Sequence, residues 1–230
     1  MHTKYVTKLH SSRQIFQYNI GMDSDKYIIP TYNKIADTYA GKYFDDLSDV
    51  PYIDTFLTYL KPGAHILDVG CGNGNFSRYI QRKGYTCEGI DLSPEMLRIA
   101  KERVPGIPFI LKDMKHLDYP DASFDGILAA YSLIHIPSEE IILTLQGFHR
   151  VLTSKGVMLI ITQKGEPDKI VDEPMKPGEK IFINFFTVKS LISYLKQAGF
   201  RIMYQEEMPI QDTTSLSDTV IYTIVRKHQE

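Results

Sequence analysis

The stretch Leu67–Phe76, which reads LDVGCGNGNF, decides the fold of this chain. It overlaps the apolar run His65–Val69, which has the length of a β-strand, and it leads into a helical pattern. The glycines Gly70, Gly72 and Gly74 therefore fall where the chain turns from a strand into a helix. Glycine in such a turn adopts a positive φ without steric cost and lets the backbone approach a ligand closely. The stretch predicts a nucleotide-like ligand at this turn.

The spacing of the glycines separates two classes of nucleotide site. A dinucleotide fingerprint reads GxGxxG after its strand, whereas here Asn75 stands where the third glycine should be. The string LDVGCGNG instead resembles motif I of the class I methyltransferases that use S-adenosylmethionine, an acidic residue followed by GxGxG. This resemblance extends over roughly residues 30–227. A nicotinamide-dependent reductase on the same fold is the weaker alternative, and a glycine turn that serves packing alone is a third.

The resemblance implies a role for each residue of this motif. Asp68 and the backbone of Gly70, Cys71 and Gly72 would lie along the methionine part of S-adenosylmethionine, and Gly74 completes the glycine turn. The reaction product S-adenosylhomocysteine would occupy the same place.

Composition limits the classes of function. The 230 residues suit one α/β domain, and the net charge of -2 with no basic cluster gives no reason to expect nucleic acid or a membrane surface as a partner. Two cysteines, Cys71 and Cys87, cannot build a disulfide framework or a metal-ligand cluster, so no metal is expected. No run reaches the ~18 apolar residues of a membrane span, and a soluble cytoplasmic protein is expected. Whether it is a monomer or a homodimer stays open.

Strand and helix patterns alternate along the chain, which predicts a doubly wound α/β fold with a parallel sheet. The strands are expected at His65–Val69, Thr86–Asp91, Pro108–Asp113, Phe124–Tyr131, Val157–Gln163, Phe200–Met208 and Val220–Arg226, the last two as a closing hairpin. Helices are expected from Tyr32 to Tyr43 and over Asp54–Leu60, Gly74–Lys83, Ser93–Arg103, Ser138–Leu152 and Val188–Ala198. The resemblance implies a Rossmann-like sheet of seven strands, mostly parallel, with an antiparallel last strand and N-terminal helices.

The same patterns divide the chain. Residues 1–28 are polar and without a clear period, and we expect an N-terminal arm of unassigned role. The resemblance implies a methyltransferase domain over residues 29–230, including its N-terminal cap helices. Within it, residues 164–186 carry three prolines and are too long for an ordinary connection, which predicts a lid or substrate-side loop, with a passive surface loop as an equal alternative.

Acidic residues follow the second and third strands. Asp91 ends its strand about twenty residues after the glycine turn, where a carboxylate can accept hydrogen bonds from a ribose diol. The resemblance places Leu92 and Met96 against the adenine ring. It also makes Asp113 the acceptor for the adenine amine, with Met114 packing on the ring. Ligands in open α/β sheets bind at the carboxyl ends of the strands, so these acids form one constellation with Asp68.

The fourth strand ends at Ala130 and Tyr131, and the loop after it should pass the reactive methyl group. His135 in that loop has a side chain whose ordinary pKa of about 6.5 suits a general base. In the resembling enzymes a histidine here often has a packing role, and we favour packing. Tyr39 and Tyr43 belong to a helix that resembles the one folded over the cofactor in small-molecule methyltransferases. They would wall the methyl-transfer chamber, or else merely pack on the sheet.

These observations predict an S-adenosylmethionine-dependent methyltransferase that acts on N or O of a small-molecule acceptor. Neither an NPPY string nor a Pro-Cys pair occurs, which disfavours acceptor amides, adenine amines and cytosine carbon. A protein that binds the cofactor without catalysis, as a partner of another protein, is the other alternative. The acceptor, the methylated atom and the use of a general base are not readable from these residues.

Overall fold

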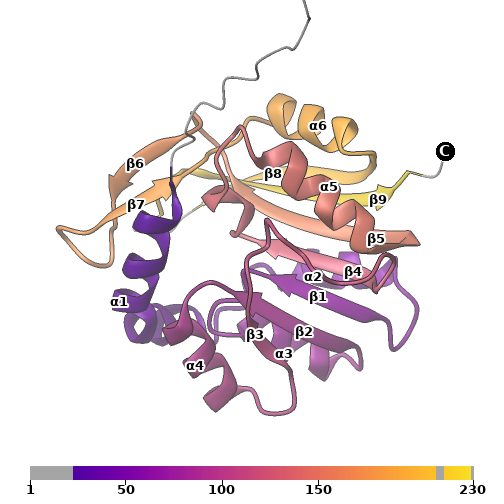
Figure 1. Cartoon of the computed structure of the whole chain (residues 1–230), viewed down its shortest axis with the longest axis horizontal. Coiled ribbons are helices and arrows are strands. Elements are labelled where there is room, and N and C mark those ends of the chain that lie inside the picture. Colours follow the sequence, from indigo (N-terminus) through magenta and orange to yellow (C-terminus); the bar gives the residue numbers. More distant parts are fainter. Residues whose placement is uncertain (1–22, 211–214, 229–230) are drawn as a thin grey trace, which may run out of the picture.

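A computed structural model describes residues 23–210 and 215–228 of the chain. Its centre is a seven-stranded sheet of order β3-β2-β1-β4-β5-β9-β8 (Figure 1). The strands are β1 His65–Val69, β2 Thr86–Asp91, β3 Phe109–Leu111, β4 Phe124–Ala130, β5 Leu152–Gln163, β8 Phe200–Pro209 and β9 Thr219–Lys227. Within the described residues, β9 pairs antiparallel with both β5 and β8, while the pairs among β1 to β5 are parallel. The predicted fold class is confirmed, including the antiparallel last strand.

Helices cover both faces of this sheet. They are α1 Asp25–Tyr43, α2 Val50–Thr58, α3 Asn75–Arg82, α4 Pro94–Arg103, the short 3₁₀ helix η1 Leu133–His135, α5 Ile141–Val151 and α6 Val188–Gln197. Alternate residues of β4 and β5 point to opposite faces, as strand geometry requires. Ile127 and Ile160 pack with α5 and α6 in one core, while Leu128 and Leu159 pack with α2 and α3 in the other.

Local sequence explains where these elements begin. Ser93 accepts a hydrogen bond from the backbone N–H of Met96 at 3.2 Å and is followed by proline, which fixes the start of α4. α2 begins at Val50, before the expected Asp54, because Pro51 fits the first turn of a helix. β5 begins at Leu152 rather than Val157, and its pairing with β4 is irregular between these two residues.

The N-terminal arm expected at residues 1–28 lies mostly outside the described residues. α1 begins at Asp25, so residues 25–28, the last of the expected arm, belong to a helix that packs on the domain. None of the helices in the described part of the chain is both long and apolar enough to cross a membrane.

The segment 164–186 differs from the expected loop. It contains a separate antiparallel hairpin of β6 Lys169–Asp172 and β7 Lys180–Ile183. Figure 1 shows α1 beside this hairpin, and Thr31 of α1 donates to the backbone oxygen of Lys180 at 2.9 Å. The hairpin and α1 therefore stand together at the carboxyl end of the sheet.

Candidate functional site

The glycine turn after β1 is the first part of the site. Gly70, Gly72 and Gly74 have φ values of 71, 53 and 79°, the left-handed region in which glycine is favoured. A Cβ atom on Gly70 would lie 2.4 Å from Cβ of Ser132, so the close approach of these two loops requires glycine. A Cβ atom on Gly72 would instead meet no atom within 4 Å. The open space beside Gly72 is where a ligand can lie.

A cavity of about 80 Å³ opens beside this turn, and we call it the glycine-turn cavity. It brings together nine of the expected cofactor residues: Gly70, Gly72, Asp91, Leu92, Met96, Asp113, Met114, Ala130 and Tyr131. Tyr39 and His135 line it as well. Strand ends far apart in sequence thus meet around one cavity.

Three expected cofactor residues, Asp68, Cys71 and Gly74, are not among the residues lining this cavity. The Asp68 side chain is buried within the sheet and accepts a hydrogen bond from Oγ of Ser77 at 2.6 Å. Burial raises the pKa of Asp68 to about 7, against the lowering effect of the Ser77 hydrogen bonds. Burial also raises the pKa of the Cys71 thiol. A Cβ atom on Gly74 would lie 2.9 Å from the Phe109 ring, so this glycine serves packing.

Asp91 is held by the backbone on both oxygens. Its Oδ2 accepts from the N–H of Gly72 at 2.9 Å and its Oδ1 from the N–H of Ser93 at 2.8 Å. Burial raises its pKa, while the backbone hydrogen bonds act in the opposite direction. Oγ of Ser93 donates to Asn33 of α1 at 2.7 Å, which ties α1 to this corner. The carboxylate is fixed in position, and each oxygen retains a lone pair for a hydroxyl group.

Asp113 lies across the cavity in a turn that its own side chain closes. Its Oδ1 accepts from the backbone N–H of Lys115 at 2.8 Å. The Lys115 ammonium reaches Asp25 of α1 at 3.2 Å and Glu140 at 3.4 Å. This ion-pair network joins the turn after β3 to the first turn of α1.

Both ring nitrogens of His135 are engaged. Nδ1 lies 3.1 Å from the backbone oxygen of Phe182, and Nε2 lies 2.8 Å from the hydroxyl of Tyr32. A carbonyl oxygen can only accept, so we assign the proton to Nδ1, and Nε2 then accepts from Tyr32. Burial lowers the pKa of His135 to about 4. The neutral ring links η1, α1 and the hairpin.

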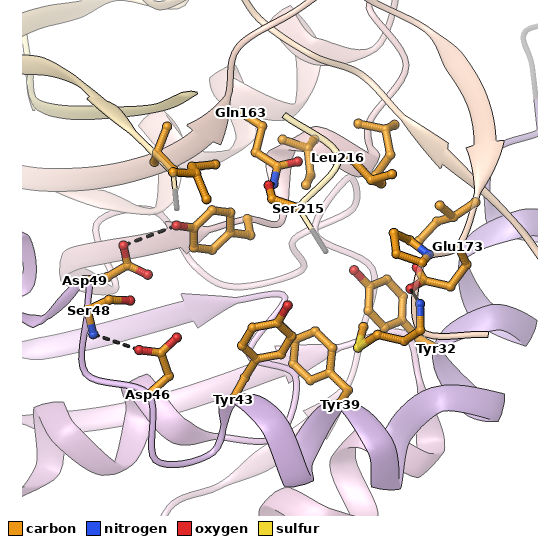
Figure 2. Close-up of a pocket in the computed structure, with 18 of the residues that line it drawn as sticks. Tyr32, Tyr39, Tyr43, Asp46, Ser48, Asp49, Gln163, Glu173, Ser215 and Leu216 are labelled. Carbon is orange, nitrogen blue, oxygen red and sulfur yellow. Dashed lines mark hydrogen bonds between the residues drawn. The ribbon is translucent and has the colours of Figure 1, made fainter. Parts of the chain in front are cut away.

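A second cavity of about 200 Å³ lies next to the first, and we call it the tyrosine cavity (Figure 2). Tyr39 and Tyr43 of α1 line it with their rings 4.7 Å apart. Tyr32, Tyr39 and Tyr131 line both cavities. Tyr131 has a positive φ of 53°, unusual for a residue other than glycine. The two cavities therefore meet at a boundary of tyrosine rings.

Two buried acids in the tyrosine cavity were not singled out from the sequence. Asp49 is 6% exposed, and its Oδ1 accepts from the hydroxyls of Tyr131 at 3.2 Å and Tyr222 at 2.5 Å. Glu173, in the hairpin turn, is 4% exposed, and its Oε1 accepts from the N–H of Met175 at 2.9 Å. Burial raises the pKa of both carboxyl groups. No local pattern around either acid connects it with the tyrosines of distant elements.

Comparison with known proteins agrees with this geometry. The family described as "Methyltransferase domain" matches residues 66–156. An uncharacterized methyltransferase of Synechocystis sp. is 25% identical over 169 residues, 74% of this chain and 71% of the relative. The methyltransferase GfsG of Streptomyces halstedii is 36% identical over 120 residues, 48% of this chain but only 42% of the relative. The chain thus spans less than half the length of this second relative.

A solved structure shares the fold over most of both chains. The 1,6-didemethyltoxoflavin-N1-methyltransferase of Burkholderia thailandensis, with 1,6-didemethyltoxoflavin and S-adenosylhomocysteine bound, superposes with a TM-score of 0.71 at 20% identity. The match covers 89% of this chain and 88% of that one. The central part of this chain is therefore similar in sequence to methyltransferases, and the chain shares the fold of one that uses S-adenosylmethionine.

Proposed function

We propose that this protein transfers the methyl group of S-adenosylmethionine to a nitrogen or oxygen of a small-molecule acceptor. The observation that carries the proposal is the shared boundary of the two cavities at Tyr32, Tyr39 and Tyr131. A cofactor in the glycine-turn cavity and an acceptor in the tyrosine cavity would meet there. Methyl transfer needs this arrangement, because the nucleophile must approach the methyl carbon opposite the leaving sulfur.

The residues lining the glycine-turn cavity fit S-adenosylmethionine. Asp91 would accept hydrogen bonds from the ribose hydroxyls, and Asp113 from the adenine amine. Leu92, Met96 and Met114 would pack against the adenine ring. The open side of Gly72 would allow the cofactor to approach the backbone. When bound, the cofactor supplies an activated methyl group on its sulfonium.

The chain's own contribution would then be positioning. The sulfonium is already activated, so alignment of the reactants can account for about 7 to 11 kcal/mol of barrier reduction without a protein nucleophile. The tyrosine rings would wall the path of the methyl group and exclude water. His135, neutral and engaged at both nitrogens, would hold α1 and the hairpin over the site rather than move a proton.

Purified protein incubated with methyl-labelled S-adenosylmethionine and a metabolite extract tests this function. Label should appear in a small-molecule product together with S-adenosylhomocysteine. Calorimetry should show S-adenosylhomocysteine binding and no NAD(H) binding. If the cofactor binds but no acceptor panel yields turnover, the protein is a non-catalytic cofactor-binding partner. The presence of a second cavity that shares tyrosine residues with the first argues against that alternative.

A further inference from the structure

The lining of the tyrosine cavity has an unbalanced charge. Three of its residues, Asp46, Asp49 and Glu173, are acidic, whereas no lysine, arginine or histidine lines it within residues 23–210 and 215–228. Asp46 is exposed at the rim, but Asp49 and Glu173 are more than nine-tenths buried. A buried carboxylate is costly unless a positive charge or several hydrogen bonds compensate it.

Hydrogen bonds compensate the two buried acids only in part. Both tyrosine hydroxyls that contact Asp49 reach its Oδ1 and do not engage Oδ2. Glu173 accepts from one backbone N–H at Oε1. No positively charged group is among the causes that shift the pKa of either acid. Two carboxylates thus face one cavity without a cation from the described part of the chain.

Aromatic rings occupy the wall between these acids. Figure 2 shows Asp49 and Glu173 on opposite sides of the cavity, with Tyr39 and Tyr43 between them. Tyrosine faces attract cations, with an effect of about 0.5 to 2 kcal/mol that increases when water is excluded. Carboxylates and ring faces therefore favour the same kind of ligand, while a phosphate or carboxylate would be repelled.

We propose that the methyl acceptor is a small molecule with a positively charged amine, which the tyrosine cavity holds between Asp49 and Glu173. This inference rests on the proposed function and specifies its substrate class. A neutral alcohol would leave the two carboxylates uncompensated. An amine supplies the missing charge and also provides the nitrogen that is methylated.

The chemistry then requires one proton transfer before methyl transfer. The ammonium group gives a proton to the Glu173 carboxylate, which becomes a carboxylic acid, and the nitrogen regains its lone pair. That lone pair forms the new bond to the methyl carbon as the carbon–sulfur bond breaks, and its electrons return to sulfur. The products are an N-methylated ammonium ion and neutral S-adenosylhomocysteine.

Calorimetry with matched ligands tests the charge requirement. Protein saturated with S-adenosylhomocysteine is titrated near pH 7 with phenethylamine, 2-phenylethanol and phenylacetate, and with the corresponding indole-ethyl amine, alcohol and acid. We expect at least one amine to bind, and at least tenfold more tightly than its alcohol and acid. Equal binding of amine and alcohol, or failure of both amines to bind, would overturn the inference.

Substitutions locate the effect. Glu173→Gln and Asp49→Asn keep hydrogen-bond acceptors and should each weaken amine binding at least tenfold. The matched control is Asp172→Asn, because Asp172 lies in the same hairpin but outside the cavity, paired with Lys180. It should leave amine affinity unchanged. Glu173→Gln should not lower the melting temperature of the free protein, since it removes a buried charge. A large loss of stability would make Glu173 a structural residue and contradict the proposal.

The alternative is that Asp49 and Glu173 interact with the cofactor instead of the acceptor, because the sulfonium of the cofactor is positive. The ratio of S-adenosylmethionine to S-adenosylhomocysteine affinity measures that interaction, since only the first carries the charge. We expect this ratio to be unchanged in Glu173→Gln. A selective loss of S-adenosylmethionine affinity would assign the acids to the cofactor and overturn the inference. Labelling of a neutral acceptor alone would also overturn it while leaving the proposed methyl transfer intact.

Discussion

At the scale of single residues, Gly72 and Gly84 allow a matched pair of substitutions. Both have a positive φ, and at both a Cβ atom would meet no atom within 4 Å. Only Gly72 lines the glycine-turn cavity, since Gly84 follows α3. Valine at either position brings a similar backbone strain, so any difference between the two variants reports on the ligand.

We therefore expect Gly72→Val to abolish S-adenosylhomocysteine binding, because the side chain occupies the space intended for the ligand. Gly84→Val should lose stability to a similar extent and keep the affinity. Calorimetry on both folded variants, with circular dichroism as a folding check, measures this. Equal affinities in the two variants would contradict the placement of the cofactor.

Asp91 carries the second prediction. Asp91→Ala should weaken S-adenosylhomocysteine binding at least about 100-fold, since each hydrogen bond to a charged group contributes about 1.5 to 3 kcal/mol. The control is Asp125→Ala, which removes a carboxylate that accepts from the N–H of His65 at the opposite end of the sheet. That variant should bind normally. An unchanged S-adenosylhomocysteine affinity in Asp91→Ala would contradict the proposal that Asp91 binds the ribose hydroxyls.

His135 carries the third prediction. Its pKa of about 4 keeps the ring neutral, and both nitrogens are engaged, so we expect packing rather than proton transfer. His135→Ala should lower kcat less than about tenfold, and its pH–rate profile should keep the shape of the wild type. A loss of about 10² or more, together with a lost inflection, would restore the general-base role.

The meeting of most of the expected cofactor residues around one cavity could be predicted, because they follow strand ends, where chain direction alone brings them together. Sequence spacing could not tell which motif residues face the cavity. Asp68 and Gly74 stand in the same motif as Gly72, yet Asp68 binds Ser77 inside the sheet and Gly74 makes room for Phe109. These orientations depend on neighbours from α3 and β3, which a local motif does not specify.

At the scale of elements, α1 is the cover of the site. It contacts α4 through the hydrogen bond from Ser93 to Asn33, and the hairpin through Thr31 and the Lys34–Glu179 ion pair. It also supplies Tyr32 and Tyr39 to both cavities. Release of bound ligands should therefore depend on how firmly α1 is held.

Asn33→Ala tests the attachment. Loss of a largely buried hydrogen bond between α1 and the Asp91 corner should speed S-adenosylhomocysteine dissociation several-fold, as measured by stopped-flow displacement. The control is Asp37→Ala, also on α1, because the exposed Asp37–Arg98 pair should contribute little. An identical dissociation rate in wild type and Asn33→Ala would show that α1 does not gate release.

The hairpin was the element that sequence reasoning missed. β6 and β7 have four residues each, which is too short for a clear alternating pattern. Two prolines lie in the connection between them. Their pairing depends on packing against α1 and η1, which lie far away in the chain. The start of α1 at Asp25 was missed for a similar reason, since its first turn is stabilised by Lys115.

At the scale of the whole molecule, Asp68 links acidity to stability. Burial raises its pKa to about 7 from an ordinary value of 3.8, so the folded protein retains a proton that the unfolded chain releases. Between these two values the contribution of this group to stability falls as pH rises. Groups that do not interact with Asp68, such as His135 with its opposite shift, titrate alike in a matched variant and cancel from the comparison.

Asp68→Asn should therefore gain stability relative to wild type as the pH increases from about 4 towards about 7. Asparagine retains an oxygen that can accept from Ser77. Melting temperatures of both proteins across this pH range measure the difference. A constant difference at all pH values would mean that Asp68 has no raised pKa.

The class of sheet, mostly parallel with an antiparallel last strand, could be predicted as a whole, because alternating strands and helices allow few topologies. The tyrosine cavity could not, since its lining includes residues from α1, the loop before α2, β5 and the hairpin turn, together with Ile210, Ser215, Leu216 and Val220. No stretch of sequence holds more than a part of it. The charge balance of that cavity became visible only when these segments were placed together.

The position of α1 over both cavities has a kinetic consequence. α1 lines both the glycine-turn cavity and the tyrosine cavity, so a movement of α1 opens both. Cofactor and acceptor would therefore enter and leave by the same movement of this helix. An acceptor in the tyrosine cavity would be enclosed on the side of the glycine-turn cavity only after the cofactor has bound there. Steady-state patterns would then be sequential and ordered, with the nucleoside product the last to leave.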